Sequence, residues 1–218
     1  MTAPRVALTF DNGPTPGITD AVLDVLAAHH VPATFFAIGH KLATPEGTAL
    51  GRETTRQGHQ LGGHTWSHSV QFGVADDDLI LDELTRLHAA VGAAGGDGLL
   101  FRPYGAGGVI DDRLMSHFGS ATLCSGGYTC VLWNVLPGDW RDQRGWVEAA
   151  LGEIEQHPWS VVVLHDVADA ALPRLDEFLT ELRLRHGEPI WSHEFPDECT
   201  PIRHGSPSSS FGTLGRSR

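Results

Sequence analysis

The sequence predicts one α/β domain, most simply a barrel of parallel strands surrounded by helices. Short apolar runs alternate along the chain with segments whose apolar residues recur at helical spacing. The short runs are almost continuously apolar, which is typical of strands buried on both faces in a parallel sheet or barrel. The alternation of strands and helices indicates a closed barrel or, as the alternative, an open doubly wound sheet. The six predicted strands are residues 6–10, 33–37, 60–62, 99–101, 128–133 and 161–164.

The helices between these strands have recognisable ends. Thr15 and Thr44, each followed by a proline, predict two helix starts, because threonine caps the first turn and proline is tolerated at the first helical position. The first helix is expected to stop before Pro32 and the second at Gly58. Further apolar stripes at helical spacing predict helices within residues 80–91, 147–154 and 172–182.

The end of the chain differs in composition from the rest. Residues 203–218 are rich in serine and glycine, which predicts a disordered tail. The barrel domain is therefore expected to comprise residues 1–202.

The charge balance excludes some classes of partner. The chain has 15 basic and 27 acidic residues and a net charge of −12, which argues against binding to nucleic acid or to an anionic membrane. A neutral sugar chain is compatible with this charge. No stretch approaches the roughly 20 apolar residues of a membrane span.

The N-terminus and the cysteines predict a cytoplasmic location. The first residues have no basic segment, long apolar segment or cleavage site of a signal peptide. The three cysteines cannot all pair within one chain, which suits a reducing compartment. They are Cys124, Cys130 and Cys199.

Polar groups that suit catalysis follow the predicted strands. In a barrel of parallel strands the carboxyl ends of all strands meet at one rim, where catalytic residues are found. We therefore expect these groups to converge. They are Asp11-Asn12-Gly13-Pro14, His64-Thr65-Trp66-Ser67-His68, Arg102-Pro103-Tyr104-Gly105, Asp139-Trp140 and His165-Asp166.

Two of these histidines suggest a metal site. His64 and His68 are four residues apart, so one helical turn would place both imidazoles on the same side. Two imidazoles and an oxygen donor are a common ligand set for Zn²⁺ or a similar divalent ion. The spacing alone is a weak signal in a chain with 13 histidines, but Asp11 and Asn12 at the same rim strengthen it.

The remaining polar residues suit hydrolysis. Asp11 would be the general base for the attacking water, although its sequence context is also a good turn signal. His165 would protonate the leaving group, because its ordinary pKa lies near neutrality. Arg102 would orient the carboxylate of the base bidentately, and Asp139 would hold His165 in its useful tautomer. Trp140 would form a wall of the pocket or, equally well, belong to the core.

These five segments, in this order, resemble the motifs of the polysaccharide deacetylase family, also called the NodB-homology or carbohydrate esterase family 4 domain. The resemblance extends from about residue 6 to residue 165. The family pattern T-F-D-D-G-P is similar to residues 9–14, and H-[ST]-x-x-H is matched in full by residues 64–68. R-P-P-Y-G is similar to residues 102–105, D-W to residues 139–140, and L-H to residues 164–165.

The resemblance implies a fold, a cofactor and a set of roles. The fold would be a distorted (β/α)₇ barrel that binds zinc, cobalt or another divalent ion. Asp11 would be the base and His165 the acid, with Arg102 and Asp139 tuning them. The backbone N–H of Tyr104 would help to hold the oxyanion. The implied metal ligands are Asn12, His64 and His68, and the aromatic residues available to a sugar are Trp66, Trp140 and Tyr104.

Three positions depart from the family pattern. The third metal ligand of the family is aspartate, where this chain has Asn12, so we predict weaker metal binding and a site one charge more positive. The segment Arg102-Pro103-Tyr104 is one residue shorter than the family motif, which would displace the oxyanion donor. Leu136, three residues before Asp139, stands where the family often has aspartate.

Three functions follow as hypotheses. The first is a metal-dependent enzyme that removes N-acetyl groups from an amino-sugar oligosaccharide or precursor. The second keeps the fold but acts on a small non-sugar amide. The third is a carbohydrate-binding protein whose metal site has decayed at Asn12. The sequence leaves the exact sugar, the metal and the oligomeric state open.

Overall fold

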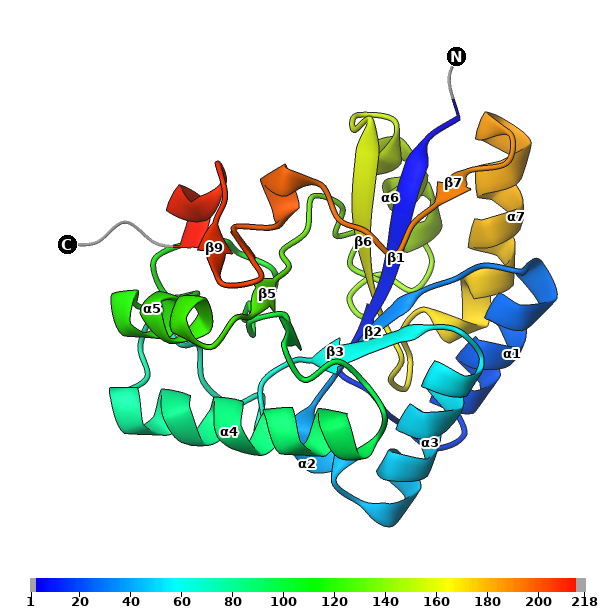
Figure 1. Ribbon diagram of the computed structural model, residues 1–218. Coiled ribbons are helices and arrows are strands. Elements are labelled where there is room, and N and C mark those ends of the chain that lie inside the picture. The colour runs from blue at the N-terminus through cyan, green and yellow to red at the C-terminus, as the bar shows by residue number, and fades with distance from the viewer. Residues whose placement is uncertain (1–2, 215–218) are drawn as a thin grey trace.

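The parallel strands form a strongly curved sheet, as Figure 1 shows. The computed structural model describes residues 3–214. In this part of the chain seven strands run parallel, in the spatial order β6-β1-β2-β3-β4-β5, with β7 beside the start of β1. The strands are β1 (Arg5–Asp11), β2 (Thr34–Ala37), β3 (Gln60–Gly63), β4 (Leu100–Phe101), β5 (Thr129–Cys130), β6 (Trp159–His165) and β7 (Ile190–Trp191). The predicted distorted barrel of parallel strands is confirmed.

The barrel is distorted because its strands differ greatly in length. β1 and β6 pair over seven residues, whereas β4 and β5 have two residues each. After β5 the chain crosses to the free edge of β6, where Val135 forms a single parallel bridge with Val162. Through this bridge the segment after β5 covers the edge of β6, while β5 and β6 themselves are not paired.

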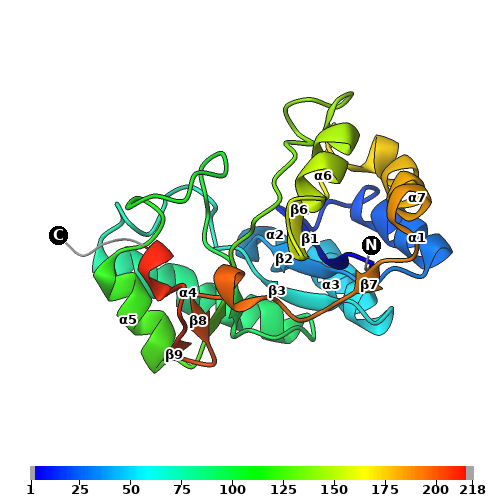
Figure 2. The ribbon, with the colours of Figure 1, turned by 90° about the horizontal axis from the view of Figure 1, so that it is seen from above.

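Helices cover the outside of the sheet, as the view from above shows (Figure 2). Most of the apolar core lies between the helices and the sheet, and a second, smaller cluster fills the barrel interior. The helices are α1 (Thr19–His29), α2 (Gly39–Leu42), α3 (Pro45–Arg56), α4 (Asp77–Ala93), α5 (His117–Ser125), α6 (Trp146–Ile154) and α7 (Leu175–His186). Short 3₁₀ turns span Leu172–Arg174, Asp197–Cys199 and Phe211–Leu214.

One of the two predicted threonine caps is confirmed and the other is wrong. The Thr44 hydroxyl accepts a hydrogen bond from the Gly47 N–H at 2.9 Å and caps α3. The first helix begins at Thr19 rather than after Thr15. Gly17, between them, has a left-handed backbone with φ of +80°, which a right-handed first turn cannot contain.

The predicted disordered tail is also wrong for the described residues 203–214. β8 (Ile202–Arg203) and β9 (Ser206–Pro207) form an antiparallel hairpin, and Ile202 pairs with Cys130 of β5. Leu214 is only 2% exposed. The serine-rich composition hides this order, because a few apolar side chains anchor the segment to the core. Residues 215–218 lie outside the described part of the chain.

Side-chain alternation along β1 places the polar residues that the site needs. Residues two apart on a strand share a face, so Ala7, Thr9 and Asp11 point into the barrel interior. Asp11 is the last residue of β1, and its register partner on β6 is His165, the last residue of that strand. No helix within residues 3–214 has the length and hydropathy of a membrane-spanning segment.

Candidate active site

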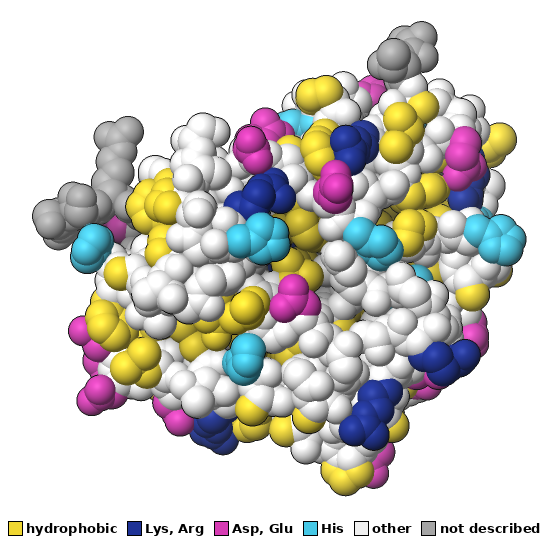
Figure 3. Space-filling view, viewed as in Figure 1, with side chains coloured by type: hydrophobic (Ala, Val, Ile, Leu, Met, Phe, Trp, Pro, Cys, Tyr) yellow, Lys and Arg dark blue, Asp and Glu magenta, His cyan; other side chains and the backbone are white. Residues whose placement is uncertain are grey.

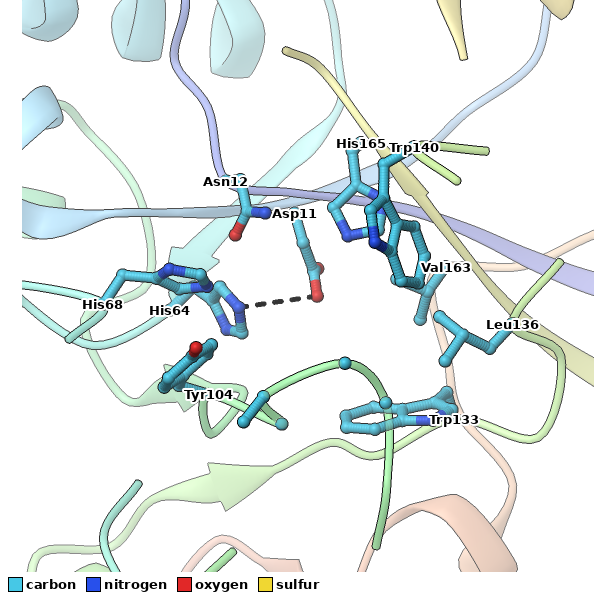
Figure 4. Close-up of a pocket in the computed structure, with 14 residues that line it drawn as sticks. Asp11, Asn12, His64, His68, Tyr104, Trp133, Leu136, Trp140, Val163 and His165 are labelled. Carbon is cyan, nitrogen blue, oxygen red and sulfur yellow. Dashed lines mark ion pairs between the residues drawn. The ribbon is translucent and has the colours of Figure 1, made fainter. Parts of the chain in front are cut away.

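A cleft of about 220 Å³ opens at the carboxyl ends of the strands. Figure 4 shows its walls, with Asp11 near the centre, Asn12 and two histidines on one side, and His165 with Trp140 on the other. The predicted convergence of the five sequence segments is thus seen in the structure. The lining residues are Asp11, Asn12, His64, His68, Tyr104, Gly105, Ala106, Gly107, Gly108, Trp133, Leu136, Trp140, Val163 and His165.

Asp11 is held by a fully buried arginine. Nη1 of Arg102 donates to Oδ1 of Asp11 at 2.8 Å and to the Thr9 hydroxyl at 2.7 Å. Nε and Nη2 of Arg102 donate to the backbone oxygens of Val131 and Leu132. Only Nη1 donates to Asp11, so the predicted bidentate contact is wrong. This leaves Oδ2 of Asp11 in the cleft.

The charge state of Asp11 follows from these neighbours. Burial raises the pKa of the carboxyl, but the charge and hydrogen bond of Arg102, with the nearby imidazoles of His64 and His165, outweigh it, so the net pKa lies below the ordinary 3.8. Asp11 is therefore ionised at neutral pH and available as a proton acceptor.

His64 and His68 come together through a loop rather than through a helical turn. Thr65 and His68 have left-handed backbones, with φ of 58° and 55°, so the predicted helical geometry is wrong. The loop nevertheless places the two ring centroids 4.9 Å apart. The Thr65 hydroxyl accepts a hydrogen bond from the His68 N–H at 3.1 Å and stabilises the loop.

Both imidazoles are in the form that metals bind. Nδ1 of His64 lies 2.9 Å from the backbone oxygen of Arg102, so Nδ1 carries the proton and Nε2 keeps its lone pair. Burial lowers the pKa of His64, against the opposing effect of Asp11. Burial and the neighbouring His64 lower the pKa of His68 to about 3. Neutral imidazoles with one nitrogen free are the ligand form of histidine.

Asn12 completes a candidate ligand set. Its Oδ1 is buried and has no hydrogen-bond partner among the described residues, and Figure 4 shows this oxygen turned toward the two imidazoles. A buried carbonyl oxygen without a partner is costly, and a cation between Asn12, His64 and His68 would satisfy it. The residues present therefore fit a divalent ion. Within residues 3–214 no group of three or more His, Cys, Asp or Glu side chains could hold a metal ion.

His165 forms a pair with a buried carboxylate. Oδ1 of Asp139 lies 2.8 Å from Nδ1 of His165, and its Oδ2 accepts from the His165 backbone N–H at 2.9 Å. Burial lowers the pKa of His165, but the hydrogen bond and charge of Asp139, with Asp11 and Asp166 nearby, more than compensate and raise it above 6.5. The ring of Trp140 packs edge-on against His165, with centroids 4.6 Å apart. The predicted pairing of Asp139 with His165 is seen in the structure.

The aromatic residues are only partly where the sequence predicted them. Tyr104 lines the cleft and packs on His68, with ring centroids 4.1 Å apart. Its backbone N–H makes no hydrogen bond within the described chain, and its role as oxyanion donor stays a prediction. Trp66 does not line the cleft, because its ring lies under the Arg86 guanidinium at 4.1 Å. Trp133 takes a place on the cleft wall instead.

Several residues around the site were assigned no role from the sequence. Trp133 is the last residue of a predicted strand that extends three residues beyond β5. The sequence therefore placed it inside the strand and not at the rim of the barrel. Glu83 and Asp166 are buried carboxylates, 2% and 1% exposed, that support the site from behind. Oδ2 of Asp166 accepts from the Thr19 hydroxyl at 2.6 Å, and burial raises the pKa of Asp166 to about 6. Asp166 stood in the sequence next to His165, whereas Glu83 gave no sequence signal.

A curved parallel sheet with an ionised aspartate, two neutral imidazoles and an Asp-paired histidine at its carboxyl edge defines a barrel with a hydrolase-type site. Residues 1–119, more than half of the chain, match the family model described as polysaccharide deacetylase. The chain belongs to the polysaccharide deacetylase family, as its motifs predicted.

Relatives of known activity act on amino sugars. The chain is 32% identical over 166 residues to a chitooligosaccharide deacetylase of Sinorhizobium fredii, with coverage of 75% of this chain and 73% of that protein. It is 33% identical over 183 residues to the peptidoglycan-N-acetylmuramic acid deacetylase PdaA of Bacillus subtilis, with coverage of 82% and 66%. The chain spans from about a third to three quarters of the length of such relatives.

Solved structures share the fold. A family 4 carbohydrate esterase from Streptomyces lividans, in complex with acetate, superposes with a TM-score of 0.74 at 23% identity and covers 93% of this chain and 99% of its own. A Bacillus anthracis protein described as a family 4 pseudoenzyme also superposes, with a TM-score of 0.68 at 20% identity and coverage of 84% and 62%. The fold is therefore shared by active and inactive proteins. Whether a chain with this fold is active depends on its site residues.

Proposed function

We propose that this protein is a divalent-metal-dependent deacetylase that hydrolyses the N-acetyl group of an amino sugar. The observation that carries the proposal is the placement of a base and an acid across one cleft, each beside a buried partner. Arg102 contacts Asp11 and lowers its pKa, and Asp139 contacts His165 and raises its pKa. A base and an acid whose surroundings move their pKa values in opposite directions are the arrangement that general acid–base hydrolysis needs.

Asn12, His64 and His68 would hold the metal. When bound there, a divalent ion such as Zn²⁺ or Co²⁺ polarises the acyl carbonyl and lowers the pKa of the attacking water. The orphaned Oδ1 of Asn12 and the neutral state of both imidazoles support this assignment.

The protein side chains move the protons. Oδ2 of Asp11, which faces the cleft, takes a proton from water as the water oxygen attacks the acyl carbon. His165 then donates its Nε2 proton to the amide nitrogen as the carbon–nitrogen bond breaks, so the products are acetate and a free amine. Nδ1 of His165 keeps its proton, which it donates in a hydrogen bond to Asp139. The proton that is transferred therefore comes from Nε2.

The cleft walls favour a neutral sugar. Trp133, Trp140 and Tyr104 line the cleft, and aromatic faces suit the apolar faces of pyranose rings. Among the fourteen described residues that line it, none is lysine or arginine. Relatives that act on chitooligosaccharides and peptidoglycan support an acetylated amino sugar as the substrate class.

Acetate release tests the proposal. Purified protein supplied with Zn²⁺ or Co²⁺ is incubated with chitooligosaccharides and, in parallel, with a panel of simple acetamides. We expect acetate from the sugars and none from Asp11→Asn with metal still bound. Release from simple amides alone would favour the small-amide hypothesis. An absence of metal binding at millimolar concentration would favour the decayed, binding-only protein.

We also propose that the protein is located in the cytoplasm. The three cysteines are free, and Cys130 and Cys199 are buried. Free thiols support a reducing compartment, and fractionation of cells would test it.

A further inference from the structure

A buried carboxylate outside the cleft holds the loop that carries the two histidines. Glu83 lies on α4 and is 2% exposed. Its Oε2 accepts from the backbone N–H of Trp66 at 2.7 Å and of Ser67 at 3.1 Å, and its Oε1 lies 3.2 Å from the same Ser67 nitrogen. These two N–H groups belong to the residues between His64 and His68.

No positive side chain neutralises Glu83 in the described chain, because none of the ion pairs of residues 3–214 includes it. A buried carboxylate is costly unless its oxygens accept strong hydrogen bonds. Glu83 receives these bonds from backbone N–H groups alone. The carboxylate and the loop therefore depend on each other.

The loop cannot hold this shape through a regular hydrogen-bond pattern. Thr65 and His68 are both left-handed, a conformation that costs free energy in residues other than glycine. The remaining supports are the Thr65 hydroxyl and the contacts of Thr65 and Trp66 oxygens with α2. Among the described residues, Glu83 is the carboxylate that accepts hydrogen bonds from the backbone of this loop.

We propose that Glu83 is a positioning residue that fixes the distance between the His64 and His68 imidazoles and thereby sets the affinity of the site for a divalent cation. The inference rests on the proposed function, because it takes these histidines to be metal ligands. Groups that orient metal ligands from outside typically change affinity about 10- to 100-fold when they are replaced.

The experiment measures Co²⁺ and Zn²⁺ binding by calorimetry in protein stripped with EDTA. Glu83→Gln keeps the shape of the side chain but replaces one acceptor oxygen with an NH₂ group. We expect its dissociation constant to rise about 10- to 100-fold. The matched control is Asp78→Asn, which removes the same charge from an exposed position on α4. Asp78 makes no ion pair within residues 3–214 and lies away from the loop contacts of Glu83, so this variant should bind metal as the native protein does.

Three further arms separate a positioning role from fold stability and from charge. Urea unfolding establishes that each variant is folded at the temperature of the binding assay. Glu83→Asp keeps the charge but withdraws the oxygens from the loop, so a positioning role predicts weaker binding here too. Amide exchange at Ser67 should accelerate in both Glu83 variants and stay unchanged in Asp78→Asn.

Two results would overturn the inference. The first is native metal affinity in folded Glu83→Gln. The second is weak binding in Glu83→Gln together with native affinity in Glu83→Asp, because the effect would then be one of charge rather than position. His64→Ala is the reference for the proposed function. If His64→Ala binds metal as tightly as the native protein, the metal site itself is wrongly assigned, whatever Glu83 does.

Discussion

Replacement of Asp139 by asparagine should lower the pKa of His165 and reverse the pH dependence of stability near neutrality. Asp139 is fully buried, and its two oxygens accept from the Nδ1–H and the backbone N–H of the same histidine at 2.8 and 2.9 Å. Asparagine has one carbonyl oxygen, so it can accept only one of these bonds. An NH₂ group facing Nδ1 favours the tautomer with the proton on Nε2 and opposes the imidazolium.

The size of the change follows from the lost contact. A hydrogen bond to a charged group contributes about 1.5–3 kcal/mol, and its loss removes that stabilisation from the imidazolium, so the pKa of His165 should fall. Burial, the largest single influence on this histidine, then prevails. The alkaline limit of activity should move to lower pH, because His165 must be protonated to donate.

The effect on stability has a definite sign. In the native protein the folded pKa of His165 lies above 6.5. Its contribution is therefore fully present below pH 6.5 and is lost as the pH rises through the folded value. In the variant the folded pKa lies below 6.5, so the free energy of unfolding should instead fall as the pH decreases below 6.5.

Two measurements check this reasoning in metal-free protein. One is an NMR titration of the His165 ring, and the other is urea unfolding from about pH 5 to about pH 8. Asp24→Asn is the control, because Asp24 is exposed on α1 and its loss should leave both measurements unchanged. An unaltered His165 titration in folded Asp139→Asn would refute the reasoning.

Three other changes test the loop that follows β1 and its support. Asn12→Asp should tighten Co²⁺ binding, because the carboxylate adds a negative charge. Both residue types tolerate the left-handed φ of 77° at this position. An unchanged calorimetric dissociation constant would show that Asn12 is not a ligand. Arg102→Met should lower the free energy of unfolding in urea by about 3–5 kcal/mol, because Asp11 is left buried without its partner; a loss below about 1 kcal/mol would contradict this. Gly13→Ala places a methyl group 2.0 Å from an oxygen of Asp166 and should cost about 1–3 kcal/mol in the same assay. Gly92→Ala, in open space on α4, is its control and should be neutral or stabilising by about 0.5–1 kcal/mol.

The rim could be predicted from sequence because it depends on local patterns. Strand ends are marked by the change from apolar to polar residues, and the carboxyl ends of parallel strands meet at one edge. This is why Asp11, His64, Tyr104 and His165 were found without any knowledge of their contacts. The Thr44 cap was equally accessible, since a cap depends on four neighbouring residues.

The direction of individual side chains could not be predicted in this way. Trp66 follows one predicted strand and Trp133 is the last residue of another, yet Trp66 lies outside the cleft and Trp133 lines it. The difference arises from the left-handed Thr65, which turns the loop, and from Glu83 on a helix 17 residues further along the chain. Such contacts join segments whose separation in sequence carries no signal. The bond between Arg102 and Asp11 spans 91 residues and is of the same kind.

The C-terminal hairpin has a consequence for handling the protein. β5 has only two residues, and β8 covers the side of it that β4 leaves open. A chain cut after residue 202 would lose β9, the hairpin partner that holds Ile202 beside β5. The short strand would then be a poorly protected edge, to which another molecule can add a strand. The cut would also uncover the hollow now filled by Leu214. The C-terminal segment, which its composition predicts to be disordered, therefore protects the protein from self-association. A shortened version should aggregate when it is expressed.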